Sequence, residues 1–200
     1  MIIKNAKRSI LGFTLIELMI AVVIAAILVT IALPNFRDFM RRNNVSAQAN
    51  NLLADIQYAR SEAITRRTFV SLCPRPAGAT DDSTSCVPGG GTNFDNGWIV
   101  YQTTALNTVF TGGVGQQLLR ITAAPRMVSI RSPVATILTL NARGELASEI
   151  TGRNFFICYK AGPDQTAAGQ SSNAVPGSRL NIATSGRASI QPLQANAVCD

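Results

Sequence analysis

The distribution of apolar residues divides the chain into three parts. The first part is an apolar run from Phe13 to Leu33, in which Glu17 is the only charged residue. A helix rises about 1.5 Å per residue, so these 21 residues span about 30 Å, the thickness of the hydrocarbon core of a bilayer. The run therefore predicts a membrane-spanning helix. An acid inside such a helix costs about 2–3 kcal/mol, which marks Glu17 as a functional residue.

The second part keeps a helical period but is amphipathic. Its apolar residues recur at spacings of four and three, which places them on one helix face: Val45, Ala49, Leu52, Ile56, Ala59 and Ala63. Asp55 and Arg60 are among the polar residues that lie mostly off that face. Pro34 lies between the two parts and should kink the helix. We therefore expect one helix from Phe13 to about Arg67, whose second half packs on a globular domain.

Beyond Arg67 the pattern changes to short runs of β-forming residues separated by turns. We expect strands at residues 69–73, 97–101, 117–121, 127–130, 136–140, 154–159, 179–184 and 187–190. Two polar stretches without periodicity, residues 74–97 and 162–177, are expected to be loops. Helices and strands do not alternate, so the predicted fold class is α+β, with one long helix packed against an antiparallel, β-rich domain at residues 68–200.

The segment before the apolar run is short, and its only charges are three bases: Lys4, Lys7 and Arg8. A secretory signal would have a shorter apolar run followed by its cleavage site, whereas here Gly12 precedes the run. Cleavage after Gly12 would keep the helix and leave a free amine on Phe13. That amine would lie four residues from Glu17, and an ammonium group is the partner that a buried carboxylate requires. In a helical assembly the amine could equally come from a neighbouring subunit.

Residues 12–18 (GFTLIEL) and residues 32–36 (ALPNF) closely resemble the class III signal of type IV pilins and type II secretion pseudopilins. The resemblance implies that prepilin peptidase cleaves between Gly12 and Phe13 and that Phe13 is N-methylated. It also implies that Glu17 contacts the N-terminus of an adjacent subunit and that the helix continues through Pro34. Residues 1–12 are then a leader, and residues 13–33 are a transmembrane segment that becomes filament core.

The resemblance also places the protein in the cell. The basic leader keeps the N-terminus in the cytoplasm, so the chain is expected to cross the bacterial inner membrane once, with a periplasmic C-terminal domain, and to enter a pilus on the cell surface. Residues 58–63 (YARSEA) and 94–101 (FDNGWIVY) resemble the GspH/FimT group of minor pilins and pseudopilins. The implied partners are other major and minor pilins.

The chemical groups of the chain argue against catalysis. No histidine is present, which removes His-assisted nucleophiles and most zinc chemistry. Gly89-Gly90-Gly91 lacks the lysine of a phosphate-binding loop, and Asn93, Asp95 and Gly97 fit a turn better than a calcium loop. We expect neither an enzyme nor a cofactor or metal site.

The four cysteines suit an oxidising compartment and allow three disulfide connectivities. We favour two pairs. Cys73–Cys86 would close a short loop, and Cys158–Cys199 would tie the tail to a strand.

Some FimT-like minor pilins bind DNA through a Gly-Arg-x-Arg motif near the C-terminus. The matching place here reads Gly186-Arg187-Ala188-Ser189, so the second arginine is missing. Arg179 is expected to lie beside Arg187 across a hairpin, which would give a weak, non-specific contact to the phosphates of double-stranded DNA. Because half of the motif is absent, we prefer the interpretation in which Gly186 makes a turn and Arg187 is a solvated strand residue.

Three functions are therefore compared. The leading hypothesis is a minor pilin with a structural or assembly role at or near the tip of a type IV pilus. The second is a DNA-binding minor pilin for DNA uptake in natural transformation. The third is a type II secretion pseudopilin. Residues 32–36 resemble pilus subunits more than secretion subunits.

Overall fold

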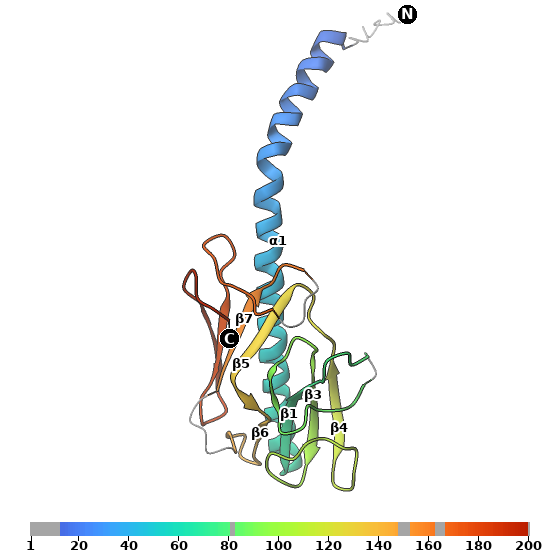
Figure 1. Cartoon of the computed structure of the whole chain (residues 1–200), viewed down its shortest axis with the longest axis vertical. Helices are drawn as coiled ribbons and strands as arrows, with labels where there is room; N and C mark the ends of the chain where they lie inside the picture. Colours follow the sequence, from blue (N-terminus) through green and yellow to red (C-terminus); the bar gives the residue numbers. More distant parts are fainter. Residues whose placement is uncertain (1–12, 81–82, 148–152, 163–166, 200) are drawn as a thin grey trace, which may run out of the picture. The chain divides into compact units, whose positions relative to one another are not determined.

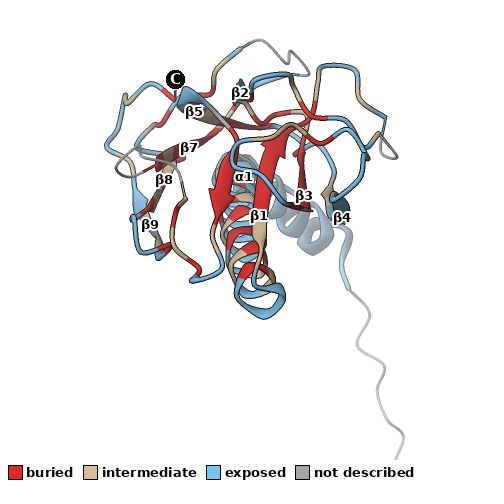
Figure 2. Ribbon diagram, turned by 90° about the horizontal axis from the view of Figure 1, so that it is seen from below, coloured by how far each residue is buried: buried red, intermediate tan, exposed pale blue. Residues whose placement is uncertain are grey.

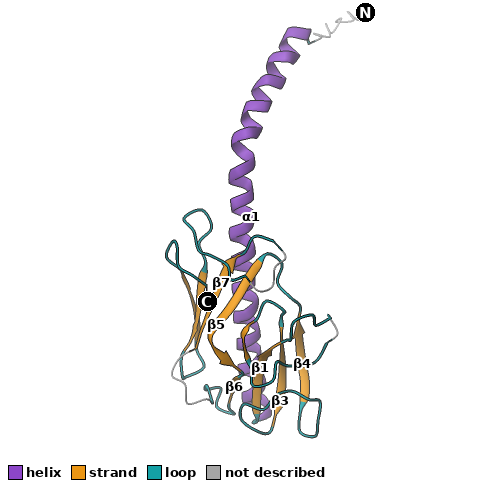
Figure 3. Cartoon of the chain, viewed as in Figure 1, coloured by secondary structure: helices purple, strands orange, loops and turns teal. Residues whose placement is uncertain are grey.

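The computed structural model describes residues 13–80, 83–147, 153–162 and 167–199. The chain divides into two compact units, with the boundary after Asp38. Helix α1 (Leu15–Arg66) belongs to both units and continues without a break through Pro34. The first unit contributes its apolar part, and the second contributes its amphipathic part together with all the strands (Figures 1 and 3).

The amphipathic face predicted for the second half of α1 is confirmed. Its six apolar residues, Val45, Ala49, Leu52, Ile56, Ala59 and Ala63, are each no more than 1% exposed. Figure 2 shows buried residues on the face of α1 that the strands surround. Apolar burial contributes about 25 cal/mol per Å² of surface removed from water, so this stripe accounts for much of the attachment of the helix to the sheets.

The strands form two antiparallel sheets. Sheet A has the order β4-β3-β1-β6, and sheet B has the order β2-β5-β7-β8-β9. The bounds are β1 (Phe69–Pro74), β2 (Gly91–Asn93), β3 (Trp98–Thr103), β4 (Gln117–Thr122), β5 (Val128–Thr136), β6 (Leu138–Leu140), β7 (Arg153–Tyr159), β8 (Ser178–Ile182) and β9 (Ala188–Pro192). The α+β class, with a helix followed by antiparallel sheets, is confirmed.

The structure differs from the predicted strands at three places. The strand expected at residues 127–130 is longer, because β5 continues to Thr136. The expected loop 74–97 contains β2, which pairs with β5; β2 is too short and glycine-rich to give a β pattern. The expected strand 136–140 is divided, because β5 of sheet B ends at Thr136 and β6 of sheet A begins at Leu138. Only Ile137 lies between them, so the chain passes from one sheet to the other at this corner.

The core has a main cluster and a smaller one. In the main cluster the helix stripe packs against the inner faces of both sheets, with the rings of Phe94 and Phe155 edge to face at 5.1 Å. The smaller cluster lies on the outer side of sheet A around Cys73, Ile99 and Tyr101. Burial raises the pKa of Tyr101 to about 12, and its hydroxyl donates a hydrogen bond of 2.6 Å to the Thr108 carbonyl.

Asp55 was predicted to lie off the buried face of α1, and that prediction is wrong. The residue is 5% exposed, and its carboxylate accepts hydrogen bonds from Trp98 Nε1 (2.8 Å), Thr122 Oγ1 (2.5 Å) and Arg120 Nη1 (2.6 Å). Position 55 lies three residues after Leu52 and four before Ala59, at the border of the stripe, so its side chain reaches sheet A. The Arg120 guanidinium also covers the Tyr58 ring at 4.1 Å.

Replacing Asp55 should therefore lower the stability of the domain. Asp55→Ala leaves the buried Trp98 Nε1–H and the Thr122 hydroxyl without their acceptor, and we expect a loss of about 3 kcal/mol in the free energy of unfolding. Urea unfolding of the full chain in detergent, followed by tryptophan fluorescence, measures this loss. Glu62→Ala is the matched control, since its ion pair with Arg66 lies on the helix surface and should contribute less than about 1 kcal/mol. Equal losses for the two variants would contradict the role given to Asp55.

Candidate functional site

The first turn of α1 contains the predicted assembly residue Glu17. Thr14 precedes the helix and caps it: its Oγ1 accepts a hydrogen bond of 3.3 Å from the Glu17 N–H, and its carbonyl accepts one of 3.2 Å from the Leu18 N–H. Thr14 and Glu17 have the spacing of a capping box, and a carboxylate in the first turn is stabilised by the helix dipole. Glu17 therefore has a local role in starting the helix, which the sequence interpretation missed.

The predicted processing site lies at the start of the described chain. Gly12 lies outside the described residues, and Phe13 is 83% exposed. Pro34 lies inside α1, with helix on both sides of it.

The part of α1 up to Leu33 carries an apolar surface that the described residues leave exposed. Its large apolar side chains from Leu15 to Leu33 are about half exposed or more, from 78% at Leu15 to 50% at Leu33. Within the described residues α1 is long and apolar enough to cross a membrane. Exposed apolar patches of this extent mark membrane or protein contacts.

Both favoured cysteine pairs are present as disulfides. Cys73 in β1 is bonded to Cys86, with Cα atoms 5.8 Å apart, and closes the loop after β1. Cys158 in β7 is bonded to Cys199, with Cα atoms 6.2 Å apart, and holds the C-terminal tail on sheet B. Cys158 is also packed closely by Gly177, where an added Cβ would lie 2.5 Å from the Cys158 Sγ.

The β8–β9 hairpin separates the two arginines that were expected to be neighbours. Arg179 is paired in register with Gln191 and donates a hydrogen bond of 2.7 Å to its Oε1. Arg187 lies at the turn, where its carbonyl accepts a hydrogen bond from the Ala183 N–H. Antiparallel pairing thus places Arg179 four positions from the residue opposite Arg187, about 13 Å along the strand. The predicted arginine pair does not exist.

Gly186 instead brings Arg187 to a second turn, at residues 141–145. Gly186 has a positive φ of 74°, and a Cβ at this position would lie 1.9 Å from the carbonyl oxygen of Gly144. The Arg60 Nε–H donates to the same oxygen at 3.0 Å, and the Leu146 N–H donates to the Thr184 carbonyl at 2.8 Å. The expected turn at Gly186 is therefore also a close contact between two turns and α1.

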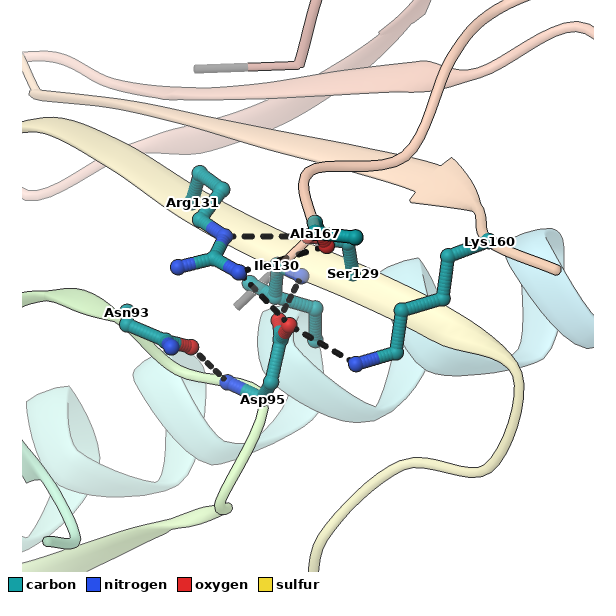
Figure 4. A network of polar contacts seen from close by, with 7 residues as sticks. All are labelled: Asn93, Asp95, Ser129, Ile130, Arg131, Lys160 and Ala167. Atoms are coloured by element: carbon teal, nitrogen blue, oxygen red, sulfur yellow. Dashed lines mark hydrogen bonds and ion pairs between the residues drawn. The ribbon is translucent and has the colours of Figure 1, made fainter. Parts of the chain in front are cut away.

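Asp95 is the centre of a buried polar network that sequence reasoning missed (Figure 4). Its Oδ1 accepts from the Ile130 N–H at 2.7 Å, and its Oδ2 accepts from Arg131 Nη2 at 3.0 Å and Lys160 Nζ at 2.9 Å. Asp95 is fully buried and the Lys160 side chain is 3% exposed. Two cations compensate the desolvated carboxylate. The residue assigned to a turn thus joins the loop before β3 to sheet B.

The side chains that could hold a metal ion are dispersed. Across the described ranges, no three His, Cys, Asp or Glu residues lie close enough to bind one. Asp55 and Asp95 are each committed to hydrogen bonds within the fold.

Comparison with known proteins gives two family matches. The model of the family described as type II transport protein GspH matches residues 48–186. The model of the prokaryotic N-terminal methylation motif matches residues 7–33. No curated protein sequence matches the chain at a significant level.

Two crystal forms of the type IV minor pilin FimU from Pseudomonas aeruginosa are similar in structure. In one, the alignment is 23% identical, covers 78% of this chain and 98% of that chain, and has a TM-score of 0.53. In the other it is 22% identical, covers 75% and 98%, and has a TM-score of 0.49. The first likeness shows that this chain has the fold of that pilin.

The contact between Gly186 and Gly144 can be tested with two alanine variants. Gly78→Ala and Gly186→Ala add a Cβ at nearly the same backbone angle, φ 75° and 74°. The strain of a Cβ at positive φ should lower the free energy of unfolding of each variant by about 1 kcal/mol. Gly78 has no heavy atom within 4 Å of the added Cβ, so only Gly186→Ala should lose a further ~1–3 kcal/mol from overpacking. Urea unfolding midpoints measure the difference. A Gly186→Ala variant as stable as Gly78→Ala would exclude the close contact.

Proposed function

Because the chain belongs to the GspH family of type II transport proteins and carries the prokaryotic N-terminal methylation motif, we propose that it is a minor pilin that helps to assemble a type IV pilus. One observation carries the proposal: the apolar run of α1 up to Leu33 exposes its large apolar side chains, and Glu17 is the only acid in that run. Such a surface serves as a bilayer anchor before assembly and is buried among other helices afterwards. The role is structural, at or near the filament tip, and involves no catalysis.

The proposed processing follows from the order of residues at the N-terminus. Prepilin peptidase cleaves after Gly12 and removes residues 1–12, and the new N-terminus at Phe13 is methylated. The Glu17 carboxylate then pairs with the terminal amine of an adjacent pilin, where exclusion of water strengthens the attraction. Thr14 supports this contact because it holds the first turn, and with it Glu17, in a helical conformation.

The proposed topology is a single pass through the bacterial inner membrane. Residues 13–33 cross the membrane, the helix continues to about residue 67, and residues 68–200 form the periplasmic domain. The bases Lys4, Lys7 and Arg8 favour a cytoplasmic N-terminus. The two disulfides are compatible with an oxidising periplasm. Other major and minor pilins are the partners in the assembled filament on the cell surface.

Deletion of the gene tests this role, and Glu17 tests the mechanism. We expect the deletion to reduce the number of surface pili and twitching motility, and the wild-type gene to restore both. Glu17→Ala should be inserted and cleaved normally, because removing an acid from an apolar helix favours insertion by about 2–3 kcal/mol, but it should be incorporated poorly into sheared pili. Immunoblots of membrane and pilus fractions measure both steps. Glu62→Ala, outside the apolar segment, is the control.

Unchanged piliation after deletion would contradict the assembly role. Normal incorporation of Glu17→Ala would contradict the proposed ion pair while leaving the assembly role in place.

DNA uptake is the second candidate, since Arg187 is exposed at a turn that touches the turn containing Arg143. Arg187 and Arg143 would bind phosphates of double-stranded DNA without reading its sequence. In a mobility-shift assay at low salt with the full chain in detergent, Arg187→Ala should weaken binding several-fold and lower its salt dependence. Arg126→Ala, an exposed arginine on another loop, is the control. No shift by the wild-type chain would exclude this function.

A type II secretion pseudopilin is the remaining alternative, because the matching family is described as type II transport protein GspH. The two systems differ in what deletion removes. Loss of exoprotein secretion with normal piliation would favour the pseudopilin.

A further inference from the structure

We propose that a pocket at the C-terminal end of α1 binds an acidic segment of a neighbouring pilin subunit. The pocket, called here the Arg67 pocket, is lined by Arg67, Phe69, Leu106, Ala142, Arg143 and Ala147 together with three polar neighbours, and has a volume of about 720 Å³. This inference rests on the proposed pilin function and names the surface and the chemistry of one of its contacts.

The Arg67 pocket lies where three elements meet. Helix α1 ends at Arg66, strand β1 begins at Phe69, and the turn at residues 141–145 follows β6. All of these belong to the second compact unit. The pocket is about 40 Å along the helix from Phe39, where that unit begins. Its two arginines carry positive charge that an acidic protein segment would complement, so its occupant is expected to come from another protein.

The backbone of Arg67 is the first sign that this pocket has a function. Arg67 has a positive φ of 53°, and the Thr68 N–H donates to the Ala63 carbonyl at 3.3 Å. This is the hydrogen bond of a Schellman motif, in which Arg67 occupies the left-handed position that ordinarily favours glycine. A residue with a Cβ is disfavoured there. An arginine in this disfavoured conformation makes its side chain a candidate for a functional role.

The charges in the pocket are available to a partner. The Arg67 guanidinium makes no hydrogen bond or ion pair with any residue that the structure describes. Arg143 Nε contacts the Glu145 carboxylate at 3.0 Å, but the two side chains are 81% and 45% exposed, so the pair is weak and can be exchanged. Two arginines with planar, bidentate donors suit carboxylates.

The turn that carries Arg143 is held in place before any partner binds. Asn141 Oδ1 accepts hydrogen bonds from the backbone N–H groups of Arg143 (2.9 Å) and Glu145 (3.0 Å). A hydrogen bond from Asn141 and the charge of Arg143 lower the pKa of Glu145. The contact between Gly144 and Gly186 fixes the turn from the other side. A preorganised turn reduces the entropy lost on binding.

The walls of the pocket favour a peptide over DNA. The same pocket that holds the two arginines is also lined by apolar groups, from Phe69, Leu106, Ala142 and Ala147. A duplex presents charged phosphates and sugars and would leave these apolar groups without complementary contacts. An extended peptide with a carboxylate flanked by apolar side chains satisfies both kinds of surface, as interface cores with a charged rim do.

Arg67→Gly tests the inference without weakening the fold. Glycine is favoured at this left-handed position, so the variant should unfold at the same temperature as the wild-type chain or a higher one. Its incorporation into sheared pili should nevertheless fall by about tenfold, because a charge-assisted contact is lost. Arg143→Glu should give a similar loss, and Arg126→Glu, on another loop, should give none. Immunoblots of pilus and membrane fractions measure incorporation, and thermal unfolding of each full chain measures stability.

A photo-crosslinking residue in place of the exposed Ala142 identifies the occupant in living cells. We expect a crosslink to a pilin peptide that contains aspartate or glutamate, and we expect Arg67→Glu to abolish it. A crosslink to nucleic acid, or to a pilin peptide without an acid, would overturn the proposal. Normal incorporation of Arg67→Gly and Arg143→Glu would also overturn it. If deletion of the whole gene reduces piliation while these variants do not, the pilin function stands and only the Arg67 pocket is excluded.

Discussion

The hydrogen bonds of the Asp55 carboxylate fix how the long helix meets the sheets. Apolar burial alone would allow α1 to slide or rotate against sheet A, because Leu, Ile and Ala side chains pack without direction. Asp55 removes that freedom, since Trp98 of β3 and Arg120 and Thr122 of β4 must all reach one carboxylate. Asp95 fixes a different contact, because it holds the loop before β3 against sheet B. Two buried acids, one for each sheet, thus give direction to a core that is otherwise apolar.

The sequence pattern predicted the elements better than their contacts. Periodicity revealed α1 and most strands, because apolar spacing reports directly which face is buried. Periodicity failed for Asp55, because a charged residue at the border of the stripe was interpreted as exposed. The hydrogen-bond donors that make its burial possible come from strands more than forty positions away, which a local pattern does not report. The same limit applies to Arg179 and Arg187. Their proximity depended on a hairpin register that short strands do not encode in their own residues.

The candidate functional features belong to the two ends of the helix, and only those at the N-terminal end could be predicted from the sequence. The N-terminal features form a contiguous motif, so Gly12, Phe13 and Glu17 could be identified from order alone. At the C-terminal end, Arg67 has no motif; its interest comes from a backbone angle and from Arg143, which lies far from it in sequence. Such a site becomes visible only when the fold brings the two arginines to one pocket.

The corner at Ile137 has a mechanical consequence. Because β5 and β6 are joined by this single residue, neither sheet can be peeled from α1 without pulling on the other. Tension along a filament would enter the domain through its helix and be divided at once between the two sheets. The domain should therefore resist stretching as one body and yield in a single step, which suits a subunit whose neighbours pull on it from both directions.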